Sequence, residues 1–208
     1  MKTLIIAIAL CVTTPYLFAY IPSREYFLKD EIDPAVAAIF VKDLTLLKQA
    51  IANGSDLKQK FEFSWQYQTS TIKFEKGNLL MYAISLGWYE GVLELLRSGA
   101  KSNVYVKGIK PSNLVIDRCQ VKEIAEMSDM MMAVMAGNAD IVKLLIIEGG
   151  DTRGTMAVEF AKNCTQGTSP AGLVHMRSLA SPEILEILKE GKKAEWAKKG
   201  LPAEGSKP

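Results

Sequence analysis

The side chains that could act in acid–base, nucleophilic or metal chemistry are few. The 208-residue sequence has one histidine, His175, in a segment that reads as a loop, and three cysteines. No serine or cysteine stands in a nucleophile-elbow motif, and there is no glycine-rich phosphate loop. With Cys11 set aside as part of the N-terminal segment, the other two cysteines and one distant histidine do not match a zinc site. The sequence therefore predicts a non-enzymatic protein without catalytic residues, cofactor or metal.

Cys119 and Cys164 can take part in one covalent step, the formation of a disulfide. An even cysteine count in an exported chain favours a single bridge. The bridge would fasten the segment that contains residue 119 to the last third of the chain. The alternative is a pair of buried free thiols, because free cysteine is one of the most often buried residue types. Cys11 belongs to the N-terminal segment described below.

Aromatic side chains are the other concentrated chemical feature. Phe61, Phe63, Trp65 and Tyr67 alternate with polar residues, a period of two that predicts a strand with one aromatic side. Residues 69–74 can form the return strand of a hairpin. The aromatic side could pack on neighbouring helices, or it could be a hydrophobic finger offered to another protein, since Tyr and Trp are favoured interface anchors. The candidate protein-binding residues are Phe61, Phe63, Trp65, Tyr67, Trp88, Tyr89 and Tyr105.

The N-terminal residues have the pattern of an export signal. Lys2 supplies one positive charge, an apolar run extends from Leu4 to Val12, and Ala19 can precede a cleavage point. We therefore predict a signal peptide at 1–19 and a periplasmic mature protein. An uncleaved anchor or a buried first helix is the alternative. The apolar run is shorter than a bilayer span, and we expect no stable membrane insertion after cleavage.

The charge balance narrows the class of partner. The formal net charge is +2, which gives no electrostatic case for nucleic acid binding. Residues 194–208 are basic and polar and are predicted to form a partly disordered tail. Residues 20–193 are then long enough for one domain with its own core. We expect the partner to be another protein.

A repeated pattern predicts how the chain is organised. Glycines stand at 87 and 99, and again at 137 and 149, with an aliphatic stretch between the members of each pair. Ala83 and Ala133 each lie four places before the first glycine of their unit. The pattern predicts a helix, a glycine turn, a second helix and a closing glycine, because glycine adopts the left-handed conformation that ends helices. Weaker copies occur near 32–56 and 154–193, the last ending at Gly191.

This unit resembles the ankyrin repeat over residues 77–103 and 127–153. The family's Thr-Pro-Leu-His opening is replaced by Asn-Leu-Leu-Met at 78–81 and Ser-Asp-Met-Met at 128–131, which removes the usual capping residues. The resemblance implies an all-α fold, an ankyrin-type helical repeat solenoid of about four repeats with extended, partly β-hairpin loops. A helical bundle without repeats is the alternative.

The segments between the units are longer than the family's period allows, so we expect insertions on one face. The second insertion is predicted to hold a short strand around Tyr105, a turn at 108–111 and a helix from Asp117. A helix is predicted at 154–163 as the first of the fourth unit, and residues 164–180 read as a loop.

The resemblance also implies a use, because ankyrin-type stacks bind other proteins through a concave face and finger loops. Similar exported bacterial proteins include immunity proteins that bind periplasm-acting toxins, and some of these toxins are secreted phospholipases. The sequence-based hypothesis is a non-catalytic periplasmic inhibitor of such a toxin. The alternative is a periplasmic scaffold or an oxidative-stress accessory protein. Both rest on likeness of fold, which constrains function only weakly.

Overall fold

The computed structural model describes residues 33–116, 119–150, 152, 155–160, 171–175 and 179–198. Its helices are α2 (Pro34–Val41), α3 (Leu44–Ala52), α4 (Leu79–Ser85), α5 (Tyr89–Arg97), α6 (Asp129–Met135), α7 (Ala139–Ile147) and α9 (Pro182–Lys198). Its strands are β1 (Phe61–Tyr67), β2 (Ser70–Gly77), β3 (Tyr105–Ser112), β4 (Val115–Ile116), β5 (Cys119–Ser128), β6 (Thr155–Phe160) and β7 (Ala171–His175). The predicted signal peptide at 1–19 lies outside this part.

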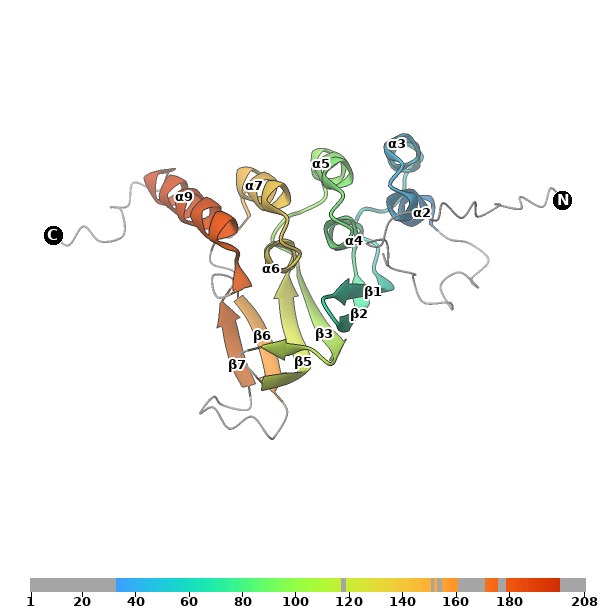
Figure 1. The fold of residues 1–208 in the computed structure, drawn as a ribbon. Helices are drawn as coiled ribbons and strands as arrows, with labels where there is room; N and C mark the ends of the chain where they lie inside the picture. The colour runs from blue at the N-terminus through green and yellow to red at the C-terminus, as the bar shows by residue number, and fades with distance from the viewer. Residues whose placement is uncertain are drawn as a thin grey trace, which may run out of the picture.

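The helices form pairs that stack in the order of the sequence (Figure 1). An inner row contains α2, α4 and α6, and an outer row contains α3, α5 and α7, while α9 packs on α7. Successive pairs contact each other through both rows. This arrangement buries apolar helix faces that a single pair would leave in water.

Side-chain caps begin most of these helices. The Asp33 carboxylate accepts the Ala35 N–H at 2.8 Å, and Pro34 occupies the first helical position, as the sequence predicts. Asn78 caps α4 through the Met81 N–H at 2.8 Å. Ser128 caps α6 in the same way, accepting the Met131 N–H at 3.1 Å. The expectation that these helices lose their capping hydrogen bonds is therefore wrong.

The predicted glycine turns are confirmed at five positions. Gly54, Gly87, Gly99, Gly137 and Gly149 have φ between +61° and +96°, a region that side chains disfavour. The unit end expected at Gly191 is absent, because Gly191 lies inside α9, where an added Cβ would come within 2.9 Å of Ile146. Glycine at 191 permits close packing of α9 on α7.

The connectors between the helix pairs form a sheet. Seven described strands pair antiparallel in the order β1-β2-β3-β5-β6-β7, with β4 beside β5. The β1–β2 hairpin matches the prediction from the aromatic alternation, with Trp65 opposite Ile72. Ile72 of β2 lies opposite Pro111 of β3, and Ile124 of β5 lies opposite Val158 of β6, which joins each connector to the next.

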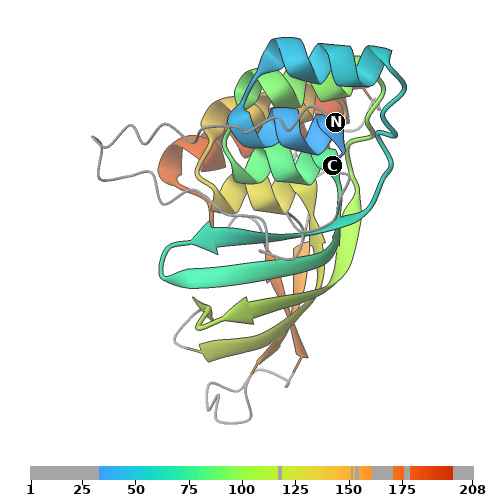
Figure 2. The ribbon, with the colours of Figure 1, turned by 90° about the vertical axis from the view of Figure 1, so that its right-hand side faces the viewer.

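The sheet lies beneath the inner row of helices, so the molecule has an outer helical layer, an inner helical layer and a sheet (Figures 1 and 2). In Figure 2 the β1–β2 hairpin extends along the underside of the helices. One continuous buried cluster includes side chains from all three layers, such as Leu95, Tyr82 and Phe63. The helices and the sheet therefore share one core.

The predicted fold, an all-α solenoid of ankyrin-type repeats, is wrong. The seven-stranded antiparallel sheet makes the fold α+β. The physical reason is that strands from successive connectors hydrogen-bond to one another, β2 to β3 and β5 to β6, whereas the expectation treated the connectors as separate loops.

Three local predictions are also corrected. The helix expected from Asp117 is replaced by β5, and the helix expected at 154–163 is replaced by β6 over its described residues. The expected loop at 164–180 contains β7, which carries His175.

In the part of the chain that the structure describes, no helix combines the length and the apolar character needed to cross a bilayer.

Candidate protein-binding groove

Most of the predicted aromatic finger is core. Phe63 is 1% exposed and stacks on Phe74 of β2 with ring centroids 4.6 Å apart. Tyr82 of the inner helix α4 meets Phe61 edge-on at 5.6 Å and Phe63 at 5.3 Å. A Cβ on Gly77 would lie 2.0 Å from the Phe63 ring, so glycine makes this packing possible. For Phe61 and Phe63 the structure supports the alternative interpretation, in which the aromatic side packs on the neighbouring helices.

The end of the hairpin differs from its base. Trp65 is 5% exposed, but Tyr67 is only half-buried, and their ring centroids are 5.2 Å apart. The Tyr67 hydroxyl accepts a hydrogen bond from Gln68 Nε2 at 3.2 Å. Partial burial raises the pKa of Tyr67 above its ordinary value, so the phenol stays neutral at physiological pH. Tyr67 therefore presents both an apolar ring and a neutral hydroxyl at the tip.

The tip faces a groove of about 590 Å³. Its other walls are the turns that follow α4 and α6 and the start of α9. The lining residues are Trp65, Gln66, Tyr67, Gln68, Ser85, Leu86, Gly87, Val134, Met135, Ala136, Gly137, Asn138, Leu179 and Ser181. We call this site the tip groove.

Two turns give the tip groove its shape. Gly87 and Gly137 hold left-handed conformations with φ of +61° and +69°. The N–H groups of both glycines donate within their turns, to the Ile84 carbonyl at 2.9 Å and the Val134 carbonyl at 3.1 Å. Lys42 Nζ, from the first helix pair, donates to the Leu86 carbonyl at 2.8 Å and so supports the first of these turns.

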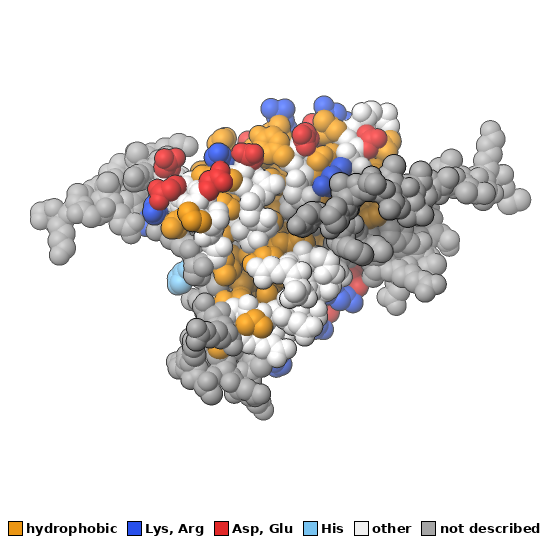
Figure 3. Space-filling model, viewed as in Figure 1, with side chains coloured by type: hydrophobic (Ala, Val, Ile, Leu, Met, Phe, Trp, Pro, Cys, Tyr) orange, Lys and Arg blue, Asp and Glu red, His pale blue; other side chains and the backbone are white. Residues whose placement is uncertain are grey.

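None of the described residues that line the tip groove carries a charge. Figure 3 shows hydrophobic side chains in the hollow between the helix ends and the hairpin, whereas charged side chains gather over the outer helices. A neutral, half-apolar groove edged by amides and hydroxyls suits a peptide segment or a protein loop.

The remaining sequence-predicted residues lie elsewhere. Trp88 is buried at the start of α5, where its ring covers Gly91. Tyr89 and Tyr105 are 38% and 41% exposed, but neither lines the tip groove. The structure therefore brings together only Trp65 and Tyr67 of the seven predicted binding residues.

Of the two cysteines predicted to pair, the structure describes only Cys119. Cys119 takes part in a disulfide, while Cys164 lies outside the described residues, so their pairing with each other stays a prediction. His175 is exposed on β7. Within the described ranges, no group of three or more His, Cys, Asp or Glu side chains could hold a metal ion.

Sequence reasoning missed a buried carboxylate, Asp129, at the first position of α6. It is 1% exposed, accepts the Met130 N–H at 2.8 Å and accepts the Asn103 N–H at 3.0 Å. Burial raises the pKa of Asp129 to about 6, in spite of these backbone hydrogen bonds. Asn103 Nδ2 in turn donates to the Gly149 carbonyl at 3.0 Å. Asp129 thus joins one connector to the next helix pair and has a structural role.

The cap and the first residue of α6 could have indicated this site. Ser128 matches Asn78 as a cap, but Asp129 stands where the other unit has Leu79, and an acidic residue in the first turn of a helix is usually exposed. Only the position of Asn103 in the folded chain shows why this one is buried.

No protein-family model matches the chain, and no curated protein matches it.

Proposed function

We propose that the protein is a non-enzymatic binding module that inhibits a secreted antibacterial toxin in the periplasm, such as a phospholipase effector. The observation that carries the proposal is the tip groove, a preformed neutral recess with Tyr67 at its edge. A half-buried tyrosine supplies contact area with little loss of side-chain entropy, and such residues often dominate binding energy.

Two further features support the proposal. The sequence of residues 1–19 favours export, which would place the protein where such toxins act. The groove is built from the hairpin, two glycine turns and the start of α9, all supported by one core. A preorganised site loses less entropy when it binds, which favours tight inhibition.

The test is protection from a toxin. Each secreted phospholipase effector of the source organism is directed to the periplasm of a sensitive bacterium, with or without the full chain. We expect one effector to be neutralised and to bind the purified chain. Failure of the chain to protect against any of these effectors would contradict the proposal.

The contribution of the groove is tested with Tyr67→Ala. Loss of this ring should weaken binding by about 10- to 100-fold, the range of an interface anchor. Tyr89→Ala is the matched control, because Tyr89 is exposed outside the groove. Equal effects of the two changes would exclude the tip groove as the contact.

A further inference from the structure

A second recess lies at the opposite end of α4 from the tip groove. It has a volume of about 530 Å³ and is bounded by the connector before β1 and the connector after α5. Leu57, Leu80 and Val104 form its apolar surface. Lys58 and Lys60 come from the first connector and Lys101 from the second. We call it the lysine crevice.

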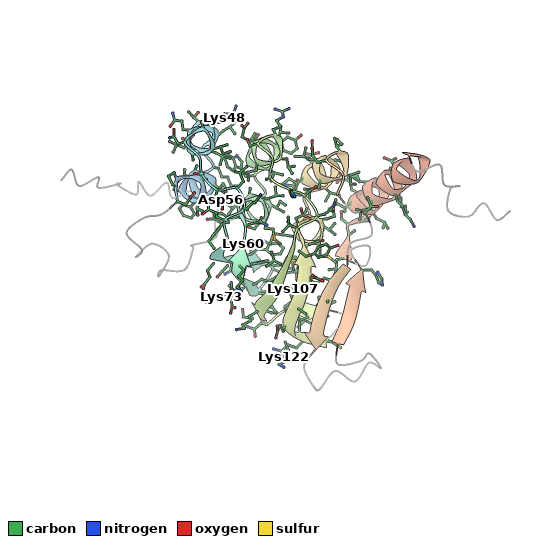
Figure 4. The ribbon with its side chains drawn as sticks, turned by 180° about the vertical axis from the view of Figure 1, so that it is seen from behind. Lys48, Asp56, Lys60, Lys73, Lys107 and Lys122 are labelled. Carbon is green, nitrogen blue, oxygen red and sulfur yellow. The ribbon has the colours of Figure 1, made fainter. Side chains whose placement is uncertain are left out.

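The two connectors lie next to the inner helices. Figure 4, the view from behind, shows Asp56 and Lys60 on the segment that leads from α3 to β1. Asn78, the cap of α4, also lines the crevice. Because the walls belong to two successive helix pairs, the recess is part of the folded framework.

The lysines of the crevice differ in their pairing from two lysines of the neighbouring sheet. Lys73 and Lys110 lie 2.8 Å and 3.0 Å from the carboxylates of Glu62 and Glu75. In the described part of the chain, Lys58, Lys60 and Lys101 form no ion pair. These three ammonium groups are therefore available to a ligand.

One carboxylate faces these lysines. Asp56 lines the crevice, and its Oδ1 accepts the backbone N–H of Lys58 at 2.9 Å. It therefore holds the turn of the connector, and three positive charges face one negative charge. A recess with one predominant sign of charge attracts ligands of the other sign.

We propose that the lysine crevice binds an acidic peptide segment of a partner protein, with an aliphatic side chain on the apolar surface. Positive charges on both walls suit an extended chain that carries more than one carboxylate. The apolar surface favours a segment that combines acidic and leucine-like residues.

The choice of a peptide over an anionic lipid follows from the same residues. The cations are all lysines, and none is an arginine with the planar fork that binds phosphate at two points. They are divided between two connectors, whereas a single headgroup would require them to converge on one point. The inference rests on the proposed function only in taking the ligand to be a protein.

The test uses the full chain and a fluorescent peptide in which glutamates alternate with leucines. Binding is measured by fluorescence anisotropy at low salt, where exposed charges are least screened. We expect the K58A/K60A/K101A variant to bind the peptide about tenfold more weakly than the unchanged chain, since three exposed charges are lost. The K107A/K143A/K189A variant removes the same charge from exposed ion pairs and should bind like the unchanged chain.

Two modified peptides and one lipid probe complete the experiment. Replacing the glutamates by glutamine, or the leucines by alanine, should each weaken binding. The proposal is overturned if the original peptide does not bind, if both triple variants lose affinity equally, or if only vesicles of anionic phospholipid bind. These assays contain no toxin, so a failed protection experiment with a positive peptide result would refute the inhibitor function alone.

Discussion

The second and third helix pairs build the same backbone from different side chains. α4 and α6 have equal lengths, as do α5 and α7, and each element of the later pair lies 50 positions after its counterpart (79 to 129, 89 to 139). The left-handed glycines also correspond, Gly87 to Gly137 and Gly99 to Gly149. Backbone conformation is therefore shared, and the differences concern what fills the space around it.

The starts of the outer helices show one such difference. Asn138 caps α7 by accepting the Ile141 N–H at 3.1 Å. Trp88 occupies the same position in α5 and makes no side-chain cap, but its ring lies over Gly91, where a Cβ would come within 2.0 Å of the ring. A side-chain hydrogen bond therefore caps the start of α7, whereas a buried ring packs over the start of α5.

The inner helices differ in what they present to their neighbours. Tyr82 of α4 reaches the aromatic hairpin, while the corresponding residue of α6 is Met132, a buried side chain without a ring. Asp129 replaces Leu79 and bonds to a connector. The left-handed glycines are therefore common to both pairs, while each pair has its own outer-helix start and its own interior above the sheet.

The largest expected effect comes from removing the contact between α4 and the hairpin. Tyr82→Ala should lower the free energy of unfolding by about 3–5 kcal/mol, because it leaves a cavity beside Phe61 and Phe63. Urea denaturation measures the loss. Tyr82→Phe keeps the ring and should cost less than about 1.5 kcal/mol. Similar losses for both variants would contradict this role of the ring.

The second prediction concerns the carboxylate that distinguishes α6 from α4. Burial raises the pKa of Asp129 to about 6 from an ordinary 3.8, so the folded protein holds this proton more tightly than the unfolded chain. The stability from this group is fully present below pH 3.8 and is lost as the pH rises through about 6. The loss should be on the order of 3 kcal/mol.

Urea denaturation of the wild type and Asp129→Asn at a series of pH values measures this term. The difference in unfolding free energy between the two should change across the window in which Asp129 titrates. A pH-independent difference would show that the buried carboxylate does not titrate as described.

The third prediction tests the space under Trp88. Gly91→Ala should lower stability by about 1–3 kcal/mol, the usual cost of overpacking. In a Trp88→Ala background the same change should cost much less, because the ring that the new Cβ meets is gone. Thermal or urea denaturation of the four proteins completes the cycle, and simple additivity would disprove the steric explanation.

The smallest expected effect belongs to the cap of α7. Asn138→Ala should cost about 1 kcal/mol by leaving the Ile141 N–H without its acceptor. Asn138→Asp retains an acceptor and should be close to neutral. If alanine and aspartate have the same effect, the cap does not contribute as proposed.

The sequence predicted the parts of the fold that follow local rules. Glycine spacing predicted the helix pairs, and the alternation of Phe61, Phe63, Trp65 and Tyr67 predicted the hairpin. Strand β5 was missed because its register shifts between Val121 and Glu123 and between Ile124 and Glu126. These irregularities place buried residues at 121, 124 and 127, a spacing of three that mimics a helix.

The candidate site was predicted only in part. An aromatic strand looks the same in sequence whether its rings meet a partner or the chain's own helices. Only the position of the sheet under α4 buries Phe63 and leaves Tyr67 at the tip groove. Gly87 and Gly137 were predicted as turns, but their meeting with the hairpin depends on long-range packing.

The central claim is that the sheet and the helices form one cooperative core, so that the tip is the only part of the aromatic hairpin left for binding. Native-state hydrogen exchange tests it most directly, because it measures the opening free energy of individual amides. We expect protected amides of the β1–β2 ladder to open with the same free energy as those of α4, equal to that of global unfolding. A hairpin that exchanges at much lower free energy, while α4 stays protected, would contradict the claim.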